Sequence, residues 1–378
     1  MKEKKLFLLD GHALVYRAHY AFINRPLINS KGINTSAITG FVRALWDILQ
    51  KQKPTHIAVA FDPKGPTFRN RDYPLYKANR DAQPEDIGIA LPYINSIVKA
   101  FNIPIIIVED YEADDVIGTI AKQAEGEGFK VYMVTPDKDY AQLVSENIFM
   151  YKPSRSGNGV DILGVPEILE KWDIENVNQV IDVLGLQGDS VDNIPGIPGI
   201  GAKTAVKLLK VYNSVEGIIE NVGELKGKQK ENVENFAEQG LLSKQLATIK
   251  IDVPITFNAE SYKVEQYNYD ALSEVFKELE FRSLADQILG KSVHVQGDLF
   301  GGEAKAKTVK KEESTYSVSD QNIENTPHEY ELVNTASEMK KLAETLAKQK
   351  IISFDTETTG IDANIAKLVG MAFSFKAH

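Results

Sequence analysis

The sequence predicts an α/β protein with an open, mostly parallel sheet, followed by a helical subdomain. Short, unbroken apolar runs rich in β-branched residues recur early in the chain, which is typical of strands buried on both faces of a parallel sheet. Helical patterns alternate with these runs, as in an open α/β sheet. The four runs are residues 6–9, 57–61, 103–108 and 131–134, and helices are expected at 37–51, 87–101, 114–125 and 140–144.

The pattern changes twice after about residue 151. Residues 301–327 are polar and mixed in charge, so they cannot bury enough apolar surface to offset the entropy of ordering and are expected to form a linker. Before the linker helical periodicity dominates, with helices expected at 168–172, 177–186, 203–212, 215–220, 228–239 and 269–279. After it, a strand is expected at 330–333, a helix at 336–348, and strands at 351–354 and 368–375.

These patterns divide the chain into four parts, and its 378 residues are enough for two to three domains of ordinary size. The expected parts are an α/β domain at 1–165, a helical subdomain at 166–289, a flexible linker at 290–328 and a short final domain at 329–378.

The composition suits a cytoplasmic location. The net charge of −10 argues against a generally basic nucleic-acid coat, although clustered metal-binding acids would bias that total. The chain has no cysteine, which excludes disulfides, thiolate metal sites and cysteine nucleophiles. The basic start precedes an apolar run too short for the core of a signal peptide, and no stretch approaches the length of a membrane span.

Acidic side chains follow each of the four apolar runs. In parallel sheets ligands bind outside the carboxyl ends of the strands, so these acids are expected to converge on one edge. Crowded carboxylates cannot all stay ionised without a cation between them, and the simplest candidate is a hard divalent ion, Mg²⁺ or Mn²⁺. The acids are Asp10, Asp62, Glu112, Asp114, Asp115, Asp137 and Asp139, and the pair Asp189 and Asp192 is a candidate to join them.

A single acid at a strand end has a simpler explanation, because Asp often caps the following helix or begins a turn. For Asp10 alone, the cap is the preferred explanation. Acids at four strand ends, two of them in tight clusters, make independent caps a poor account of the whole pattern. Together the clusters predict two cages for two or more ions, as two-metal phosphodiester chemistry requires.

A glycine-rich segment, residues 193–205, predicts a second kind of contact. Its glycines allow a tight turn in which backbone N–H groups at a helix N-terminus face a phosphate. A nucleotide P-loop is the main alternative, but Ala202 separates the last glycine from the lysine, and a helical run precedes the loop. A helix-hairpin-helix that holds a DNA backbone fits better, with Gly196, Gly199, Gly201, Lys203 and Thr204 as its candidate residues.

A long connection after Asp62, residues 64–80, interleaves basic and aromatic side chains. Long excursions in compact domains are usually functional or mobile. A solvated surface loop is the simpler interpretation of its charge, but its place beyond an acid-bearing strand end favours a gate for single-stranded nucleic acid. Its basic residues are Arg69, Arg71, Lys77 and Arg80, and its aromatic residues are Phe68, Tyr73 and Tyr76.

The ordered set of motifs resembles the 5′ nuclease domain of bacterial, family A DNA polymerase I, a relative of the flap endonucleases. The motifs are segments 10–11, 61–62, 111–115, 135–139 and 188–193 with the following glycine-rich turn, and the resemblance covers residues 6–289. It implies a PIN-like fold and places the family's metal ligands on the nine acids named above. It places the family's helical arch on residues 64–80, with Arg69, Lys77 and Arg80 as the matching cations. Pro136 departs from the family pattern, and is expected to alter the local turn without removing a ligand.

The last segment carries a second resemblance. Residues 354–360 resemble the first motif of the 3′-to-5′ proofreading exonuclease that follows the nuclease domain in polymerase I, with Asp355 and Glu357 as the matching metal ligands. This implies the incomplete start of a ribonuclease H-like domain, whose other carboxylates lie beyond His378, as does the polymerase. The chain is therefore expected to be part of a longer polymerase I.

Residues 296–300 resemble the pentapeptides with which bacterial replication proteins bind the sliding clamp. Such a segment would bury Leu299 and Phe300 in a groove of the clamp, with Gln296 as the polar member of the motif. Packing of the two apolar side chains on the helical subdomain near Leu289 is an equally good interpretation.

The resemblance implies a divalent-metal-dependent 5′-to-3′ exonuclease and flap endonuclease in DNA replication and repair. Its expected partners are DNA with 5′ flaps, nicks or RNA primers, and it is expected to be a monomer. Lys77 and Arg80 would stabilise charge on the scissile phosphate. The alternatives are a toxin-like ribonuclease, which would have no helix-hairpin-helix, a receiver domain, which needs fewer carboxylates, and a non-catalytic DNA-binding module, whose activity a chelator would not change.

Overall fold

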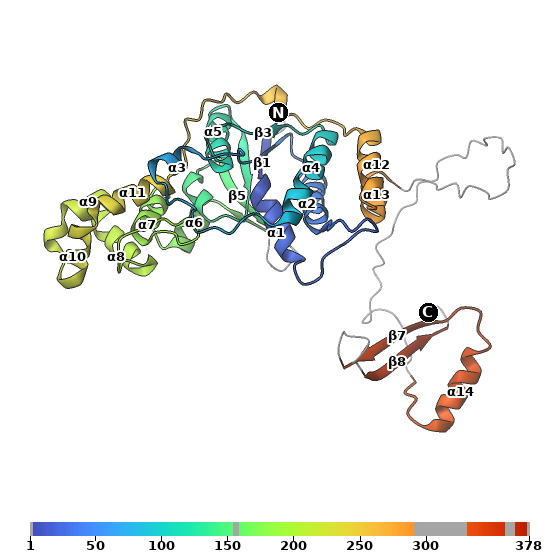
Figure 1. Cartoon of the computed structure of the whole chain (residues 1–378). Coiled ribbons are helices and arrows are strands. Elements are labelled where there is room, and N and C mark those ends of the chain that lie inside the picture. Colours follow the sequence, from blue (N-terminus) through green and yellow to red (C-terminus); the bar gives the residue numbers. More distant parts are fainter. Residues whose placement is uncertain (1–2, 154–158, 291–330, 360–366, 376–378) are drawn as a thin grey trace. The chain divides into compact units, whose positions relative to one another are not determined.

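The structure is a computed structural model that describes residues 3–153, 159–290, 331–359 and 367–375 (Figure 1). The chain divides into two compact units, Met1–Val295 and Gln296–His378. The clamp-like segment with Gln296, Leu299 and Phe300, and nearly all of the expected linker, lie outside the described residues.

The first unit is built on a six-stranded sheet in the order β3-β2-β1-β4-β5-β6. Neighbouring strands are parallel, except that β6 runs antiparallel to β5 at one edge. This confirms the mostly parallel α/β sheet that the apolar runs predict. The strands are β1 (Lys5–Asp10), β2 (His56–Ala60), β3 (Ile105–Ile106), β4 (Lys130–Val134), β5 (Ile148–Pro153) and β6 (Val160–Leu163).

Helices cover both faces of this sheet (Figure 1). One hydrophobic core joins Phe7 and Leu9 to the helices α1 (Gly11–Ala21), α2 (Ser36–Asp47) and α4 (Glu85–Ala100). The other core joins Leu6 and Leu8 to α5 (Ala113–Gly126) and continues into the helical subdomain. Alternate residues of β1 therefore enter opposite cores, because successive side chains of a strand point to opposite faces.

Three short elements differ from the predicted ones. The strand expected at 103–108 pairs only over the two residues of β3, and the helix expected at 140–144 is a single 3₁₀ turn, η2 (Asp139–Leu143). The basic segment 64–80 contains one short helix, α3 (Phe68–Asp72), and continues in turns. A π-helical turn, η1 (Ile48–Gln52), extends α2.

Beyond β6 the chain forms the predicted helical subdomain, which lies to one side of the sheet (Figure 1). The single helix expected at 228–239 is broken at Phe236, where α10 ends and α11 begins. The helices are α6 (Val165–Trp172), α7 (Gln179–Gln187), α8 (Ala202–Tyr212), α9 (Val215–Glu220), α10 (Gly227–Asn235) and α11 (Ala237–Ala247), with a 3₁₀ turn η3 (Val222–Glu224) before α10.

The chain then returns to the α/β domain. A 3₁₀ turn, η4 (Ala259–Tyr262), leads to α12 (Tyr269–Glu278) and α13 (Arg282–Ile288), and Leu272 and Phe276 are buried in the same core as α4. Residues 269–288 belong by packing to the α/β domain, although the sequence groups them with the other helices. Periodicity predicts that a segment is helical but does not identify the surface it covers.

The described part of the second unit is small. It holds α14 (Ala336–Leu346) and an antiparallel pair of strands, β7 (Ser353–Thr358) and β8 (Leu368–Ser374). Asp355 and Glu357 lie on β7 and both are exposed. Residues 331–334 form no strand, unlike the expectation for 330–333. None of the helices in the described ranges combines the length and the apolar character that crossing a membrane requires.

Candidate active site

Asp10 is held by three hydrogen bonds at the junction of β1 and α1. It caps the helix, as the simpler interpretation predicts, by accepting from the backbone N–H of Ala13 at 3.0 Å. Its other carboxylate oxygen accepts from the hydroxyls of Thr135 and Tyr140, each at 3.1 Å. A carboxylate offers about four acceptor positions, so Asp10 caps its helix and still has a position available to a ligand.

Asp62 follows β2 and is held by α1 and α5. Its carboxylate accepts from the backbone N–H of Ala113 at 2.8 Å and lies 3.2 Å from Nδ1 of His12. Nδ1 of His12 accepts from the Asp62 backbone N–H at 3.1 Å. Burial alone would raise the pKa of Asp62, but the neighbouring His12 ring and the Ala113 N–H lower it to about 2. Asp62 is therefore ionised at neutral pH. His12 stands in no recognised motif, and the signal that would find it is its place in the first turn after the β1 acid.

The basic segment 64–80 lies against the acids at the start of α5. The Glu112 carboxylate accepts from Nζ of Lys77 at 2.7 Å and from the hydroxyl of Tyr76 at 3.0 Å. The Lys77 backbone N–H also donates to the carbonyl of Asp192 at 2.9 Å, with Lys77 at a φ of 57°. The segment thus connects α5 to residues 188–193, which follow α7.

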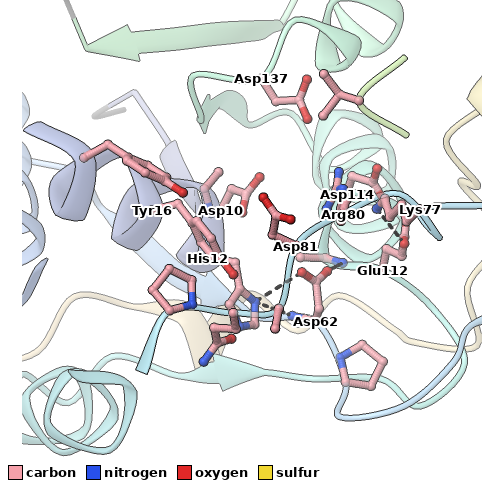
Figure 2. A pocket seen from close by; sticks show the side chains of 18 of the residues that line it. Asp10, His12, Tyr16, Asp62, Lys77, Arg80, Asp81, Glu112, Asp114 and Asp137 are labelled. Atoms are coloured by element: carbon pink, nitrogen blue, oxygen red, sulfur yellow. Dashed lines mark hydrogen bonds and ion pairs between the residues drawn. The ribbon is translucent and has the colours of Figure 1, made fainter. Parts of the chain in front are cut away.

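Five of the nine predicted acids line one cavity of about 690 Å³ beside the carboxyl ends of β1 and β2 (Figure 2). Lys77 and Arg80 line the same cavity. So do Tyr16 and Asp81, which the sequence analysis does not single out, because neither stands in a recognisable motif. The five acids are Asp10, Asp62, Glu112, Asp114 and Asp137.

Asp189 and Asp192 do not line this cavity, and each is bound to a cation. Nζ of Lys138 lies 2.7 Å from the Asp189 carboxylate, and Arg80 forms an ion pair with Asp192. Burial would raise the pKa of Asp189, but the hydrogen bond from Lys138 lowers it. The acids beyond α7 are therefore neutralised by basic side chains of the chain itself.

Asp115 and Arg69 lie behind the cavity and bind each other. Arg69 is only 1% exposed, and its guanidinium donates to both carboxylate oxygens of Asp115, at 2.7 and 2.8 Å. Asp115 also accepts from the backbone N–H groups of Glu112 and Lys250, so its four acceptor positions are filled. All four acceptor positions of Asp115 are thus used inside the protein and Arg69 is buried, so this structure gives no support to their roles as metal ligand and DNA contact, which stay predictions.

Tyr76 and Arg71, the other two residues of this segment that are predicted to bind DNA, differ in their exposure to solvent. Tyr76 is buried and its hydroxyl donates to Glu112, so its predicted DNA contact gains no support from the structure and stays a prediction. Arg71 is exposed and forms an ion pair with Asp110. Arg71 therefore remains accessible to a DNA backbone.

The buried carboxyl groups fit a divalent cation. Oδ1 of Asp139 is buried with no hydrogen-bond partner. Burial and the neighbouring Asp137 raise the pKa of Asp139 to about 8, and burial and Asp62 raise that of Asp10 to about 6. Burial, with Asp115 next to it, raises the pKa of Asp114 well above its usual value. Such shifts indicate too little positive charge for the number of carboxyl groups, which oxygen-binding cations would supply.

Within the described parts of the chain, no three carboxylate or imidazole side chains stand close enough together to form a ready metal cage. The basic side chains account for this, because Lys77 and Lys138 each hold one carboxylate of the predicted set. A cage would require these carboxylates to turn from the lysines toward an ion.

The glycine-rich turn between α7 and α8 has the backbone that the sequence predicts. Gly196 and Gly199 have φ values of 62° and 77°, a left-handed conformation that favours glycine. A Cβ at Gly196 would lie 2.4 Å from the backbone nitrogen of Gly188, so a side chain does not fit there. Lys203, which is exposed, and Thr204 lie in the first turn of α8 directly after Gly201.

Two family models match this chain. Residues 5–173 match a 5′-3′ exonuclease N-terminal resolvase-like domain, and residues 175–270 match a 5′-3′ exonuclease C-terminal SAM fold. The chain belongs to the 5′-3′ exonuclease family. In this 5′-3′ exonuclease the acids from Asp10 to Asp139 lie in the first matched domain, and Asp189 and Asp192 lie in the second with the glycine-rich turn.

Curated relatives of this 5′-3′ exonuclease are bacterial DNA polymerases I. It is 39% identical over 310 residues to DNA polymerase I of Bacillus subtilis (strain 168), an alignment that covers 82% of this chain and 35% of that protein. It is 33% identical over 414 residues to DNA polymerase I of Synechocystis sp. (strain ATCC 27184 / PCC 6803 / Kazusa), covering 98% of this chain and 42% of that protein. The 5′-3′ exonuclease chain thus spans well under half the length of these relatives.

Solved structures with the same fold include the two that follow. T5 5′-exonuclease with bound zinc has a TM-score of 0.56 at 22% identity, covering 74% of this chain and 99% of that chain. The catalytic core of Rad2 in complex with DNA substrate has a TM-score of 0.52 at 16% identity, covering 76% of this chain and 91% of that chain. These likenesses confirm the fold of the 5′-3′ exonuclease, an α/β sheet joined to a helical domain.

Proposed function

We propose that this 5′-3′ exonuclease is the 5′ nuclease part of a bacterial DNA polymerase I and also cuts 5′ flaps. The observation that carries the proposal is a cavity in which carboxylates from four segments of the chain face Lys77 and Arg80. The bacterial DNA polymerases I among its relatives support the proposal that it is part of such a polymerase. The proposed substrates are DNA with 5′ flaps, nicks or RNA primers, and the proposed location is the cytoplasm, as a monomer.

The carboxylates are proposed to bind two or more divalent ions, Mg²⁺ or Mn²⁺, because both take oxygen ligands. When bound, such ions would generate hydroxide and stabilise an in-line displacement at phosphorus. Asp115 is not among the proposed ligands. They are the cavity acids Asp10, Asp62, Glu112, Asp114 and Asp137, and the neighbouring acids Asp139, Asp189 and Asp192.

Lys77 and Arg80 are proposed to bind the scissile phosphate. Each forms an ion pair with a carboxylate, Lys77 with Glu112 and Arg80 with Asp192, and both line the cavity that a phosphate would enter. A phosphate would compete for these cations, and would leave the carboxylates free for metal ions. In the cavity the two cations would stabilise negative charge that develops on the phosphate oxygens.

The helical subdomain is proposed to hold the duplex. The turn at Gly196, Gly199 and Gly201 allows close approach of a phosphate to backbone N–H groups, and the exposed Lys203 adds positive charge. Thr204 offers a hydroxyl in the same turn of α8, and Arg71 offers a further cation on the basic segment. A non-catalytic DNA-binding module built on this turn would leave the cavity acids without a role.

Two finer proposals concern the rest of the chain. Residues 329–378 are proposed to be the start of a 3′-to-5′ exonuclease domain, because Asp355 and Glu357 lie on one strand and relatives align over 98% of the chain. Gln296, Leu299 and Phe300 are proposed to bind the sliding clamp, and a peptide of residues 293–302 that fails to bind the clamp would remove that proposal.

Asp114→Asn tests the proposed nuclease. Removal of one negative charge from the cavity should lower single-turnover cleavage of a 5′-flap substrate in Mg²⁺ about 100-fold or more, because the ions lose a ligand. DNA binding measured without divalent ions should be unchanged or tighter, because less negative charge faces the phosphates. Asp47→Asn is the matched control. Asp47 is the last residue of α2 and forms an exposed ion pair with Lys51, so this variant should cut normally. Wild-type cleavage by Asp114→Asn would contradict the site.

A further inference from the structure

Residues 246–250, which we call the strap, begin in the last turn of α11 and continue outside any helix or strand. Each of these five consecutive residues has a backbone group in one of five short hydrogen bonds to side chains of the α/β domain, and the Lys250 carbonyl also accepts from the Thr119 hydroxyl at 3.4 Å. Only three side chains make all five bonds, and all three are buried: Arg69, Asp115 and Gln142. This regular set of hydrogen bonds connects the end of the helical subdomain to the α/β domain.

Arg69 binds the strap on one side and the acids on the other. Its guanidinium donates to the carbonyls of Leu246 at 3.0 Å and Thr248 at 2.8 Å. Its remaining N–H groups donate to Asp115 and to Glu112 at 3.3 Å. All five N–H donors of the side chain are therefore used inside the protein, and none is available to DNA.

Gln142 makes the same kind of connection to the other acid-bearing segment. Its side-chain amide donates to the carbonyl of Ala247 at 3.0 Å and accepts from the backbone N–H of Ile249 at 2.8 Å. It also donates to the carbonyl of Asp139 at 3.0 Å. Gln142 thus joins the strap to the 3₁₀ turn that begins at Asp139.

Asp115 completes the set at the end of the strap. It accepts from the backbone N–H of Lys250 at 2.7 Å and from that of Glu112 at 3.1 Å. Glu112 and Asp114 stand at the start of α5, where both line the cavity. The strap is therefore connected to both groups of acids that the function needs, to Glu112 through Arg69 and Asp115, and to Asp139 through Gln142.

The other end of the connection is the glycine-rich turn. The side chain of Gln239 on α11 donates to the carbonyl of Gly196 at 2.6 Å, and the Ser243 hydroxyl accepts from the Gly196 N–H at 3.0 Å. A continuous path of hydrogen bonds thus leads from the proposed duplex-binding turn, along α11 and the strap, to the two acid-bearing segments.

We propose that Arg69 and Gln142 are positioning residues that hold the two acid-bearing segments to the strap in the geometry that binds metal. The inference rests on the proposed function for the purpose of the acids, but its first test does not require cleavage. Neither residue touches substrate or ion. Each acts through the backbone or side chain of the acids next to it, and partners of this kind typically contribute 10- to 100-fold in metal affinity.

The chain just beyond the strap supplies a matched control for stability. Further along α5, Gln123 donates to the carbonyl of Ile255 at 2.9 Å and accepts from the backbone N–H of Phe257 at 2.7 Å. These two bonds have the same chemistry as those of Gln142 to the strap, but Gln123 lies two turns of α5 beyond Asp115. Gln123→Met and Gln142→Met therefore remove comparable hydrogen bonds, and only the second touches an acid-bearing segment.

The experiment compares Mn²⁺ binding by the full chain without DNA, followed by electron paramagnetic resonance, with thermal unfolding of the same samples. We expect both variants to lose similar stability. We expect the Mn²⁺ dissociation constant to rise about 10-fold or more in Gln142→Met and to stay unchanged in Gln123→Met. Equal Mn²⁺ affinities in the two variants would overturn the proposal and leave the strap a stabilising contact alone.

Arg69→Lys supplies an independent arm that keeps the positive charge beside Asp115. A lysine cannot reach both strap carbonyls and both carboxylates, so we expect weaker Mn²⁺ binding with an unchanged DNA affinity in chelator. Weaker DNA binding with normal Mn²⁺ binding would show Arg69 to be a DNA contact and would overturn the proposal. This arm decides if Gln142→Met does not fold. Failure of the proposed function is distinguishable, because it would leave wild type unable to cut DNA while Mn²⁺ binding still separates the variants.

Discussion

At the scale of single residues, charge in the sequence does not reveal whether a side chain is buried. Arg69 and Arg71 stand two positions apart in the same basic segment, yet Arg69 is buried against Asp115 and Arg71 is exposed beside Asp110. The five-residue helix α3 that carries them has too little apolar pattern to indicate its buried side. Spacing predicts the convergence of acids on one edge, because parallel strands end together, but it does not distinguish an acid that faces the cavity from one that faces an arginine.

This difference between the two arginines gives a stability prediction. Asp115→Asn should lower the free energy of unfolding by about 3–5 kcal/mol, because it leaves the buried Arg69 guanidinium without its counter-charge. The matched variant Asp110→Asn removes the partner of the exposed Arg71 and should leave the free energy of unfolding nearly unchanged, because water screens that pair. Urea denaturation without divalent ions measures both. Equal, small losses in the two variants would contradict the burial of the Arg69 pair.

The raised carboxyl pKa values give a pH dependence. With pKa values raised to about 8 and about 6, Asp139 and Asp10 bind protons more tightly when folded than when unfolded. Their stabilising contribution is present at low pH and is lost as pH rises, from about 4 through 6 for Asp10 and through 8 for Asp139. Asp62, lowered to about 2, has the opposite effect, but only below about pH 4.

In a chelator, the free energy of unfolding should therefore fall as pH rises from about 4 to 8, with at most about 1.4 kcal/mol per pH unit from each group. Excess Mg²⁺ should flatten the slope, because a cation stabilises the ionised carboxylates. Thermal unfolding at a series of pH values with and without Mg²⁺ measures this. Asp139→Asn should lose the upper part of the slope in chelator. A flat profile in chelator would contradict the shifted pKa values.

At the scale of elements, β1, β2, β4 and the glycine-rich turn were predictable because their signals are local, whereas β5 and β6 were not predicted. Apolar runs predict strands, and the turn depends on positions that only glycine can occupy. The break between α10 and α11 and the return of α12 to α4 depend on tertiary packing, which periodicity does not contain. The strap was not predictable either, because its backbone hydrogen bonds go to side chains far away in the sequence.

The turn gives the prediction at this scale. Gly196→Ala should weaken duplex binding strongly, because a left-handed residue with a Cβ costs about 1–2 kcal/mol and the new atom would lie 2.4 Å from the Gly188 nitrogen. Gly223→Ala is the control in the same subdomain, since its Cβ would meet nothing within 4 Å. Fluorescence anisotropy with a duplex, together with circular dichroism to check folding, measures the effect. Equal affinities in the two variants would mean that the turn does not hold the duplex.

At the scale of the whole molecule, the nuclease site and both hydrophobic cores lie within residues 6–288. Among the residues that the structure describes, those that line the cavity and form the two cores all belong to the first unit. A domain with its own core folds by itself. The first unit therefore contains what a domain needs to fold on its own, together with the cavity acids. The two family models also lie wholly within it, since the second ends at residue 270.

Truncation tests this independence. A chain that ends at Gly290 should keep the melting temperature of the first unit and its single-turnover cleavage of a flap substrate. A chain that ends at Asn268 is the matched control and should not fold, because it loses Leu272, Phe276 and Leu279, each at most 1% exposed. Burial of each such side chain contributes about 1.5–3 kcal/mol, so the loss of all three removes a large part of the free energy of unfolding of an ordinary domain. Loss of cleavage on removal of residues 291–378 alone would show that the second unit takes part in the nuclease reaction, and its contact with the first unit would then have to be sought in the full chain.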